Sequence, residues 1–426
     1  MSLKIRNVEI RNIVFGTTNG ISNEILSVNK DNLIEFLKED KRIRDVKLHI
    51  ALPGDSTRIV PVKDVIEPRA KLGGDAFPGI DGEIKEVGQG ITYVLKGCSV
   101  ITTGPIVGFQ EGVIDMSGPL TDYTLFSKLN NLVVEIVKKE HVEPHEHEEV
   151  VRVAGVRAAH YLGKLALEIE DYEELTFEWE SFAKKHSEFP ELPKVAYVYP
   201  CMSQGLLHDT YFYGRDSKLM IPTMISPLEV MDGAIVSGNC VSPGSKTTTY
   251  HHQNNAVIKQ CFEKHGKEIN FIGVVLNPLM TTLNEKLRNV ALTGKLIDMM
   301  GVEGAIISQE GFGNPTTDIM MICKNLENRG IKTVLITNED AGSDGMSESL
   351  PDGTQEADAI ITTGNSNATI RLPKMDKIIG NLPDIERVTG GFAGCIQDNG
   401  ELIIEIHGII GGHNLQGNTY LSAVTI

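Results

Sequence analysis

The chain has 426 residues, a length typical of two or three domains rather than one small module. Its 40 basic and 57 acidic side chains give a net charge of −17, which argues against nucleic acid or an anionic membrane as the main partner. A composition of 41% apolar and 23% charged residues predicts a globular fold throughout. Neither a membrane-spanning run nor a signal peptide is recognisable, so we expect a cytoplasmic protein.

The cysteines are few and widely separated. No Cys-x-x-Cys pair is present, which excludes zinc-ribbon and thioredoxin motifs by spacing. Such sparse cysteines in a large chain indicate reduced thiols. The six are Cys98, Cys201, Cys240, Cys261, Cys323 and Cys395.

The first part of the chain is rich in β-strand signals, because short β-branched and apolar runs are separated by turn-forming Gly and Pro. A helix is predicted over Glu148 to Leu167, where apolar residues recur every three or four positions. An acidic stretch follows and ends in Phe-Pro-Glu-Leu-Pro, which predicts a β-rich domain over residues 1–190. The predicted strands are Leu3 to Phe15, Asp45 to Leu52, Ile91 to Thr103 and Leu132 to Val137.

From Lys194 onward, predicted strands alternate with predicted helices, over a second domain of residues 191–426. Such alternation predicts a parallel sheet with helices on both faces, and thus an α/β fold. The tail from Leu402 returns to short β-like runs. The predicted strands are Val195 to Tyr199, Phe271 to Leu276, Ala305 to Ser308, Thr333 to Thr337 and Ala359 to Thr363, and the predicted helices are Thr282 to Met300 and Thr316 to Asn328.

Three histidines, His141, His145 and His147, stand in a segment that also contains Glu148 and Glu149. Imidazoles and carboxylates are metal ligands, and in an extended loop His145 and His147 could bind one metal ion together. The His-Glu-x-x-His spacing of zincins is absent. A solvated loop that caps the following helix explains the segment as well.

The most informative stretch is Ser237-Gly-Asn-Cys240. A small, flexible Gly-Asn turn before a cysteine lets the thiol reach the preceding carbonyl group, which is the first requirement of an N-to-S acyl shift. The resulting thioester would activate the chain for cleavage between Asn239 and Cys240. A plain turn that ends a strand also explains these residues, so the spacing alone leaves the chemistry open.

Several longer segments resemble the precursor of the alpha and beta subunits of component B of the glycine, sarcosine and betaine reductases. The segments span most of the chain and follow one another in the order expected for the family. They are PVKDVIEPR at 61–69, TTGPIVGFQEGVIDMS at 102–117, HEEVVR at 147–152, QGLLHDTY at 204–211, EVMDGAIVSGNC at 229–240 and EGFGNP at 310–315.

The resemblance implies that the precursor is cut at the Asn-Cys bond, so that residues 1–239 form one chain and residues 240–426 the other. It further implies that Cys240 becomes a pyruvoyl group. After the acyl shift, Cys240 would lose its α-hydrogen and its sulfur, and the dehydroalanine would hydrolyse to a ketone. Such a ketone forms a Schiff base with an amine substrate, which activates the substrate carbon-nitrogen bond without a dissociable cofactor.

The resemblance also implies partners in a hetero-oligomer. A selenocysteine of a companion component B subunit attacks the activated carbon, and the fragment passes to selenoprotein A. The complex then yields acetyl phosphate, and the thioredoxin system restores the selenium. This chain would be the substrate-activating subunit of an oxidoreductase with a disulfide acceptor. The quaternary nitrogen of betaine forms no iminium, so the role of the pyruvoyl group with that substrate stays open.

Neighbouring residues are expected to support the self-cleavage. His208, His251 or His252 could accept the proton of the Cys240 thiol, since imidazole titrates nearest neutral pH. Hydroxyls of Thr247, Thr248 and Thr249 could donate to the oxyanion of the acyl shift. Hydrogen bonding within a loop and a hydroxyl-rich turn explain the same residues.

A substrate carboxylate favours a guanidinium clamp, and Arg69 and Arg215 lie within or beside the resembling segments. Surface salt bridges explain each arginine equally well. Residues 242–253 match the family less closely, so the choice among glycine, sarcosine and betaine stays open.

Three alternative functions remain. A D-proline reductase-type subunit also uses a pyruvoyl cysteine, although Asn239 before Cys240 fits the glycine-type group better. An uncleaved scaffold could bind a selenoprotein, or a metal through its histidine segment. An ordinary enzyme could use the intact Cys240 thiol as a nucleophile.

Overall fold

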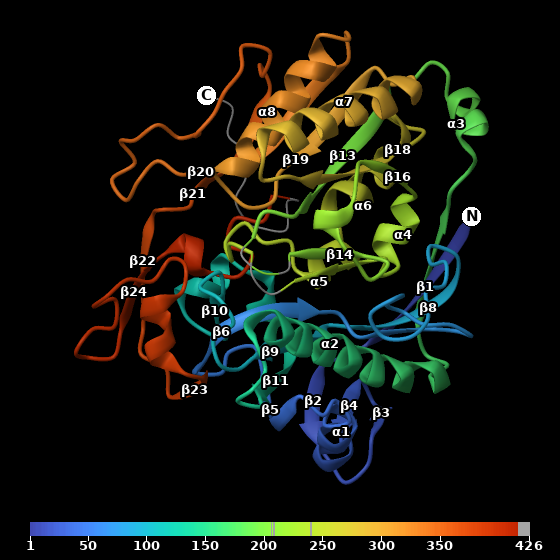
Figure 1. Ribbon diagram of the computed structural model, residues 1–426. Helices are drawn as coiled ribbons and strands as arrows, with labels where there is room; N and C mark the ends of the chain where they lie inside the picture. The colour runs from blue at the N-terminus through green and yellow to red at the C-terminus, as the bar shows by residue number, and fades with distance from the viewer. Residues whose placement is uncertain (206, 208, 239–240, 416–426) are drawn as a thin grey trace.

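The computed structural model describes residues 1–205, 207, 209–238 and 241–415 (Figure 1). Two six-stranded sheets dominate these residues, one built mainly from the first half of the chain and one from the second. A β-rich first half and a largely parallel sheet in the second half confirm the predicted α/β fold. Among the described residues no helix is long and apolar enough to cross a membrane.

The first large sheet has the strand order β10-β6-β9-β11-β5, and β23 pairs with β6 as well. Strand β6 is buried along its whole length, although it contains Arg58, Lys63 and Asp64. Each of these side chains bonds within the protein, which allows a polar sequence to occupy a buried strand. The bounds are β5 Ile43–Ala51, β6 Thr57–Ile66, β9 Cys98–Thr103, β10 Gly112–Asp115, β11 Asn130–Lys138 and β23 Lys377–Gly380.

Two smaller sheets complete the first half. A four-stranded sheet has the order β12-β1-β8-β7, and a three-stranded sheet has the order β2-β4-β3. The predicted strand from Leu3 to Phe15 is therefore two strands, and the acidic stretch after the long helix contributes β12 beside β1. The bounds are β1 Ser2–Glu9, β2 Asn12–Phe15, β3 Gly20–Ser22, β4 Ile25–Val28, β7 Arg69–Lys71, β8 Gly90–Lys96 and β12 Glu173–Glu178.

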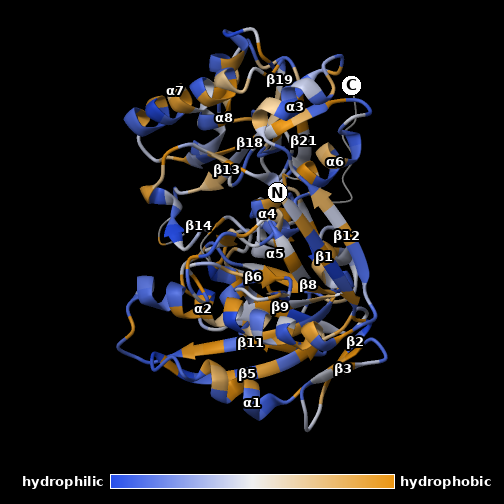
Figure 2. Ribbon diagram, turned by 90° about the vertical axis from the view of Figure 1, so that its right-hand side faces the viewer, coloured by the Kyte–Doolittle hydropathy of each residue, from blue (hydrophilic) through white to orange (hydrophobic). Residues whose placement is uncertain are grey.

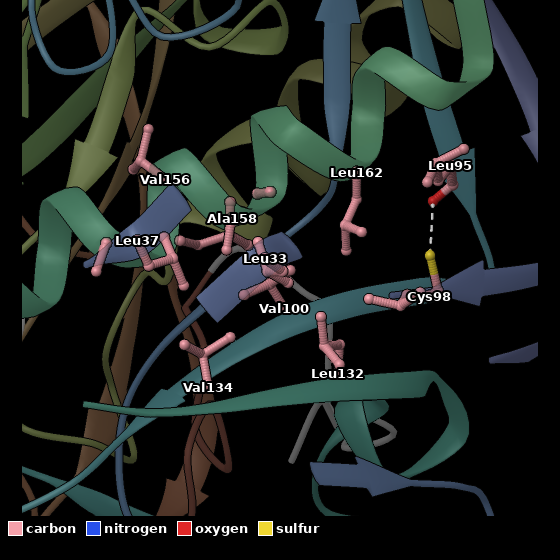
Figure 3. Close-up of a cluster of buried hydrophobic side chains, with 14 of the residues drawn as sticks. Leu33, Leu37, Leu95, Cys98, Val100, Leu132, Val134, Val156, Ala158 and Leu162 are labelled. Carbon is pink, nitrogen blue, oxygen red and sulfur yellow. Dashed lines mark hydrogen bonds between the residues drawn. The ribbon is translucent and has the colours of Figure 1, made fainter. Parts of the chain in front are cut away.

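Helix α2 covers the first large sheet. It spans Pro144–Gly163, so it begins before the predicted start at Glu148, and a capping box at Glu143 satisfies its first turn. Helix α1, Lys30–Leu37, was not predicted; the Asn29 side chain caps it. Figure 3 shows a cluster of apolar side chains from these helices, the first large sheet and β8, in which the Cys98 thiol donates to the Leu95 carbonyl, 3.6 Å away. Its labelled members are Leu33, Leu37, Leu95, Cys98, Val100, Leu132, Val134, Val156, Ala158 and Leu162.

The second large sheet has the order β16-β18-β13-β19-β20-β21. Strands β18 to β21 in this order run parallel, as predicted, whereas the edge strand β16 runs antiparallel to β18. The bounds are β13 Lys194–Met202, β16 Thr223–Ile225, β18 Asn270–Leu279, β19 Gly304–Ser308, β20 Lys332–Glu339 and β21 Ile360–Asn365.

Side chains of β13 alternate between two cores on opposite faces of this sheet. Ala196 and Val198 pack with residues of α7 and α8, whereas Tyr197 and Tyr199 pack with residues of α4 and α6. In Figure 2, β11 of the first sheet is largely orange, whereas the outer helix α7 alternates between orange and blue, as an amphipathic helix does. The helix bounds are α3 Phe182–Glu188, α4 Pro227–Met231, α6 Ala256–Lys264, α7 Leu283–Met299 and α8 Asn314–Glu327.

A small sheet, β15-β14-β17, lies between the two large sheets, and α5 packs against β6 and β17 (Figure 1). The tail returns to the first half of the chain, where β23 pairs in parallel with β6 from Lys377 opposite Thr57 to Gly380 opposite Val60. The boundary predicted near residue 190 stays a prediction. The bounds are β14 Thr210–Phe212, β15 Arg215–Asp216, β17 Ile235–Ser237, α5 Thr249–Gln253, β22 Thr369–Leu372 and β24 Leu402–Glu405.

The end of α2 is packed so closely that one methyl group should destabilise the protein. A Cβ atom at Gly163 would lie 2.2 Å from the backbone carbonyl carbon of Arg69. We expect Gly163→Ala to lower the free energy of unfolding by about 1–3 kcal/mol, because backbone atoms must shift to admit the methyl group. Urea denaturation measures this loss. The control is Gly353→Ala, where a Cβ meets nothing within 4 Å; equal midpoints for the two variants would contradict the prediction.

Candidate functional site

The segment before the predicted cut ends strand β17. Thr210 of β14 pairs with Ser237 of β17, and the Gly238 amide donates to the Asp209 carbonyl. The predicted site residues Asn239, Cys240 and His208 lie outside the described residues. The backbone is therefore described up to Gly238 and again from Val241, which is buried.

A buried lysine contacts the last described residue before the cut. The Lys246 ammonium donates to the Gly238 carbonyl oxygen. The Ser237 hydroxyl donates to the same oxygen over 3.1 Å. Lys246 is fully buried, so its charge is shielded from water and depends on acceptors within the protein. The Gly238 carbonyl is one of these acceptors.

A chain of hydrogen bonds links β17 to the first large sheet. The Ser237 amide donates to the Thr249 hydroxyl over 2.9 Å, and this hydroxyl donates to a carboxylate oxygen of Asp64 over 2.6 Å. The Thr249 amide donates to the other Asp64 oxygen over 3.0 Å. Burial raises the pKa of Asp64 to about 6, although the nearby charge of Lys246 opposes this shift.

Glu310 provides the link to the second large sheet. One carboxylate oxygen accepts from the Thr247 amide at 2.9 Å and the other from the Met202 amide at 3.0 Å. Glu310 lies just beyond the carboxyl end of β19, and Met202 is the last residue of β13, so the site occupies the carboxyl edge of the parallel strands. Burial raises the pKa of Glu310 to about 7, against the effect of these two amides.

Residues after the predicted cut are held by the C-terminal part of the chain. The Ser242 hydroxyl hydrogen-bonds to Nε2 of His407. The Gly244 amide donates to the His407 carbonyl at 2.9 Å, and the His413 amide donates to the Gly244 carbonyl at 2.7 Å. The Asn414 amide group donates to the Lys246 carbonyl at 3.1 Å. Residues 407–414 thus fix the backbone that leads from the cut to Lys246.

A pocket of about 230 Å³ adjoins this segment. Its described lining contains no charged side chain. The volume lies below the roughly 300–1,000 Å³ typical of pockets for drug-sized ligands, so the pocket is suited to a small molecule. Its lining combines residues before the cut, residues after it and the turn that opens α8: Gln110, Met202, Gln204, Gly205, Val241, Ser242, Gly311, Phe312, Asn314 and Pro315.

His251 and His252 lie buried on α5. Burial, assisted by the charge of Lys246, lowers the pKa of His251 to about 3 and that of His252 well below its usual value, so both rings are neutral at pH 7. His252 Nδ1 hydrogen-bonds to the Tyr199 hydroxyl, and its Nε2 has no hydrogen-bond partner among the described residues. Their assignment as thiol bases stays a prediction.

The threonines predicted to form an oxyanion site are buried and close to the cut. The Thr248 hydroxyl pairs with His251 Nδ1 at 3.1 Å, and the Thr249 hydroxyl donates to Asp64. The Thr248 and Thr249 hydroxyls thus have structural partners, and the Thr247 amide donates to Glu310. Their oxyanion role stays a prediction.

The two predicted substrate-binding arginines lie in different surroundings. Arg69 is buried and donates to the Met231 carbonyl at 2.5 Å and to Glu67 at 2.7 Å. Arg215 is exposed and donates to the Leu219 carbonyl at 3.1 and 3.2 Å. Neither arginine lines the pocket beside Ser242. Their role as a carboxylate clamp stays a prediction.

The expectation that His145 and His147 lie in an extended loop is wrong, because both lie in the first turns of α2. Residues two positions apart on a helix do not face each other, and His147 is buried whereas His145 is exposed. Burial, with the charge of Lys63, lowers the pKa of His147 to about 3. In the described part of the chain, no group of three or more His, Cys, Asp or Glu could hold a metal. Metal binding stays a prediction.

Four residues of the buried network were not predicted. Asp64, Asp209 and Glu310 lie within segments that resemble the reductase family, which was the available signal. Lys246 lies in the less similar stretch after the cut, beside the predicted threonines. An isolated lysine in a polar turn carries no sign of burial, so the sequence could not identify it.

The fold and the site define an α/β protein in which buried charged groups hold both sides of a Ser-Gly-Asn-Cys segment. A sequence profile of the glycine/sarcosine/betaine reductase component B subunits matches residues 1–424. The chain therefore belongs to this family of reductase complex components, as the resembling segments predicted.

Individual relatives agree with this assignment. The chain is 47% identical over 425 residues to the glycine reductase complex component B subunits alpha and beta of Peptoclostridium acidaminophilum, covering 99% of each chain. It is 45% identical to the sarcosine reductase complex component B subunit alpha of the same organism, again over 99% of each. It is 26% identical to the D-proline reductase proprotein PrdA of Acetoanaerobium sticklandii, over 78% of this chain and 54% of that protein. No solved structure matches.

The raised pKa of Glu310 predicts how stability depends on pH. Between pH 4.5 and about 7 the folded protein holds a proton on this carboxyl that the unfolded chain has released. The contribution of Glu310 to the free energy of unfolding is therefore full below pH 4.5 and is lost as the pH rises through 7. We expect Glu310→Gln to have a flatter dependence of its urea midpoint on pH over this range. An unchanged slope would contradict the assignment.

Proposed function

We propose that the chain is the self-processed, substrate-activating subunit of a glycine/sarcosine/betaine-type reductase, cut between Asn239 and Cys240. The observation that carries this proposal is the fixation of both flanks of the Asn239-Cys240 pair by buried contacts, Lys246 to Gly238 before it and His407 to Ser242 after it. A strained self-cleaving turn needs such surroundings to hold it. The name of the glycine reductase relative of Peptoclostridium acidaminophilum, two subunits in one chain, and the name proprotein for PrdA agree with a cut.

The cut follows from the chemistry of Cys240. Its thiol attacks the Asn239 carbonyl carbon, the bond from that carbon to the Cys240 nitrogen breaks, and a thioester forms. Loss of the Cys240 α-hydrogen then expels the sulfur with the Asn239 acyl group as a thiocarboxylate, which water converts to a carboxylate and hydrogen sulfide. The dehydroalanine left at the head of the second chain takes up water and releases ammonia, which gives the pyruvoyl group. The surroundings suit this chemistry, because Oδ1 of Asp209, Oγ of Ser245 and Nε2 of His252 are buried without hydrogen-bond partners among the described residues. Such polar atoms can bind groups of the processed segment.

Once formed, the pyruvoyl group supplies an electrophilic ketone that withdraws electrons from the carbon-nitrogen bond of a bound amine. The chain's own residues provide the surroundings for the substrate. The pocket beside Ser242 is large enough for glycine or an N-methylated relative. Ser242, with His407 behind it, can donate or accept a proton at the pocket wall, because the buried imidazole is neutral at pH 7.

His208, His251 and His252 remain the proposed bases for the thiol proton. Of the two that are described, His252 has the open nitrogen, Nε2. The buried ring loses a proton readily once it has taken one up, which suits a base that passes the thiol proton onward to the released amine.

The proposed partners follow from the family. They are a selenocysteine-containing component B subunit, selenoprotein A and the thioredoxin system, assembled as a hetero-oligomer that forms acetyl phosphate. The D-proline type is disfavoured as an alternative, since identity to PrdA is 26% over part of that protein against 47% over the glycine reductase relative.

Cys240 is the residue on which the cut depends. We expect Cys240→Ala to fold and remain whole, whereas the parent chain, produced with its companion subunit, gives fragments 1–239 and 240–426 by intact mass. The matched control is Cys98→Ala, which removes a buried thiol that donates to Leu95 in the first core; this variant should still be cut. The same fragments from Cys240→Ala would refute self-cleavage by this thiol.

The pyruvoyl group predicts a covalent adduct with the substrate. Borohydride treatment of the processed protein in the presence of glycine should add the mass of the reduced amine to the 240–426 chain, because a ketone condenses reversibly with a primary amine. Treatment without glycine should reduce the ketone alone. An intact thiol at residue 240 in a protein bound to its companion would instead favour the scaffold or thiol-nucleophile functions.

A further inference from the structure

In the proposed function the Lys246 ammonium only holds Gly238 in place, and its charge has no assigned part in the chemistry of the cut. It touches Gly238, the residue directly before the Asn239-Cys240 pair, and it is fully buried. Burying a lysine is costly unless its charge is compensated, and an exposed lysine would serve a purely structural turn as well. Its position therefore indicates a role for the charge itself.

We propose that Lys246 is a positioning residue for chain cleavage: its ammonium group fixes the Gly238 carbonyl and places a positive charge beside the residues that react. This inference rests on the proposed function, because it concerns how the same cut is promoted. It assigns to Lys246 a role in maturation that is separate from substrate activation.

Covalent geometry limits how far the charge lies from the reacting atoms. Consecutive Cα atoms are about 3.8 Å apart, so the Cα of Cys240 lies within about 7.6 Å of the Cα of Gly238. A positive charge bonded to the Gly238 carbonyl acts over this range with little screening, because Lys246, Gly238 and Val241 are buried. Lysine beside a cysteine favours the thiolate, which is the nucleophilic form.

The step that this charge assists is the acyl shift from the Cys240 nitrogen to the Cys240 sulfur. The Cys240 sulfur forms a bond to the carbonyl carbon of Asn239, and the bond from that carbon to the Cys240 nitrogen breaks. The thiol proton ends on the released amine, and no oxidant or reductant takes part. Negative charge develops first on the sulfur and then on the carbonyl oxygen, and a fixed cation nearby stabilises both.

The neighbouring charged groups make the effect of Lys246 adjustable. Asp64 from β6 and Glu310 after β19 interact electrostatically with Lys246. Burial raises the pKa of each carboxyl, and the positive charge of Lys246 lowers it in part. The positive charge also disfavours protonation of the two histidines on α5. Among the described residues, the buried titratable groups on the elements around the segment include Asp64, Asp209, Lys246, His251, His252, Glu310, His407 and His413, and Lys218 faces Asp209 at 3.5 Å.

Removing the charge should slow the cut and shift its pH dependence. Full-length chains made together with the companion subunit are followed by intact mass over time between pH 5.5 and 9. We expect Lys246→Met to cleave at least about tenfold more slowly at pH 7, which corresponds to losing one charge-assisted hydrogen bond. Its half-maximal rate should move to higher pH, since the thiolate is harder to form. Lys246→Arg, which keeps the charge, should keep the pH profile of the parent chain.

A second variant should shift the pH dependence of cleavage in the opposite direction. Asp64→Asn removes a negative charge that opposes Lys246 and leaves the lysine in place, so the half-maximal rate should move to lower pH. If Lys246→Met fails to fold, Asp64→Asn still tests the effect of the Lys246 charge on cleavage. Lys63→Met is the matched control, because it removes another fully buried lysine, paired with Glu111, that has no contact with Gly238; its pH profile should equal that of the parent chain.

The outcomes separate this inference from the proposed function. A parent chain that stays whole with its companion overturns both. A parent chain that is cut, with Lys246→Met cut at the same rate and with the same pH profile, overturns the role of Lys246 alone. Slower cutting with an unchanged pH profile would also overturn it, because a lysine that only stabilises the fold slows maturation without shifting a thiol titration.

Discussion

The buried charge of Lys246 is the constraint on which the arrangement around the predicted cut depends. An ammonium group without water requires acceptors and compensating charge, and it finds them in the Gly238 carbonyl and in the nearby carboxylates of Asp64 and Glu310. These groups come from the processing segment, the first large sheet and the second large sheet. Lys246 therefore interacts with groups from three parts of the chain, beside the segment that is proposed to react.

The tail of the chain gives the same site its second support. Residues 407–414 hold the backbone after the cut, and β23 adds to the first large sheet beside β6. If the chain is cut at residue 239, both new ends are therefore held by contacts that do not cross the broken bond. This arrangement lets a processed protein keep the geometry of its precursor, which a pyruvoyl group at a new chain end requires.

Prediction from the sequence succeeded where local patterns dominate. The alternating strands and helices of the second half follow from their apolar periodicity, and α2 was predicted with a late start because its first turn is polar. Strand β6 was not predicted, because a run with several charged residues is not expected to be buried. The partners that bind these charged side chains lie far away in the sequence. The extended loop expected at His145 and His147 is wrong for a related reason, since a capping box begins the helix before these histidines.

The sequence by itself determined the α/β class, the family and the Ser-Gly-Asn-Cys segment, because apolar periodicity and short matching segments are properties of residues close together in the chain. Only the tertiary structure decided that Lys246 is buried against Gly238 and that Asp64 and Glu310 interact with its charge. Their meeting depends on how two sheets pack, and the energy of a buried charge depends on that packing rather than on its neighbours in sequence.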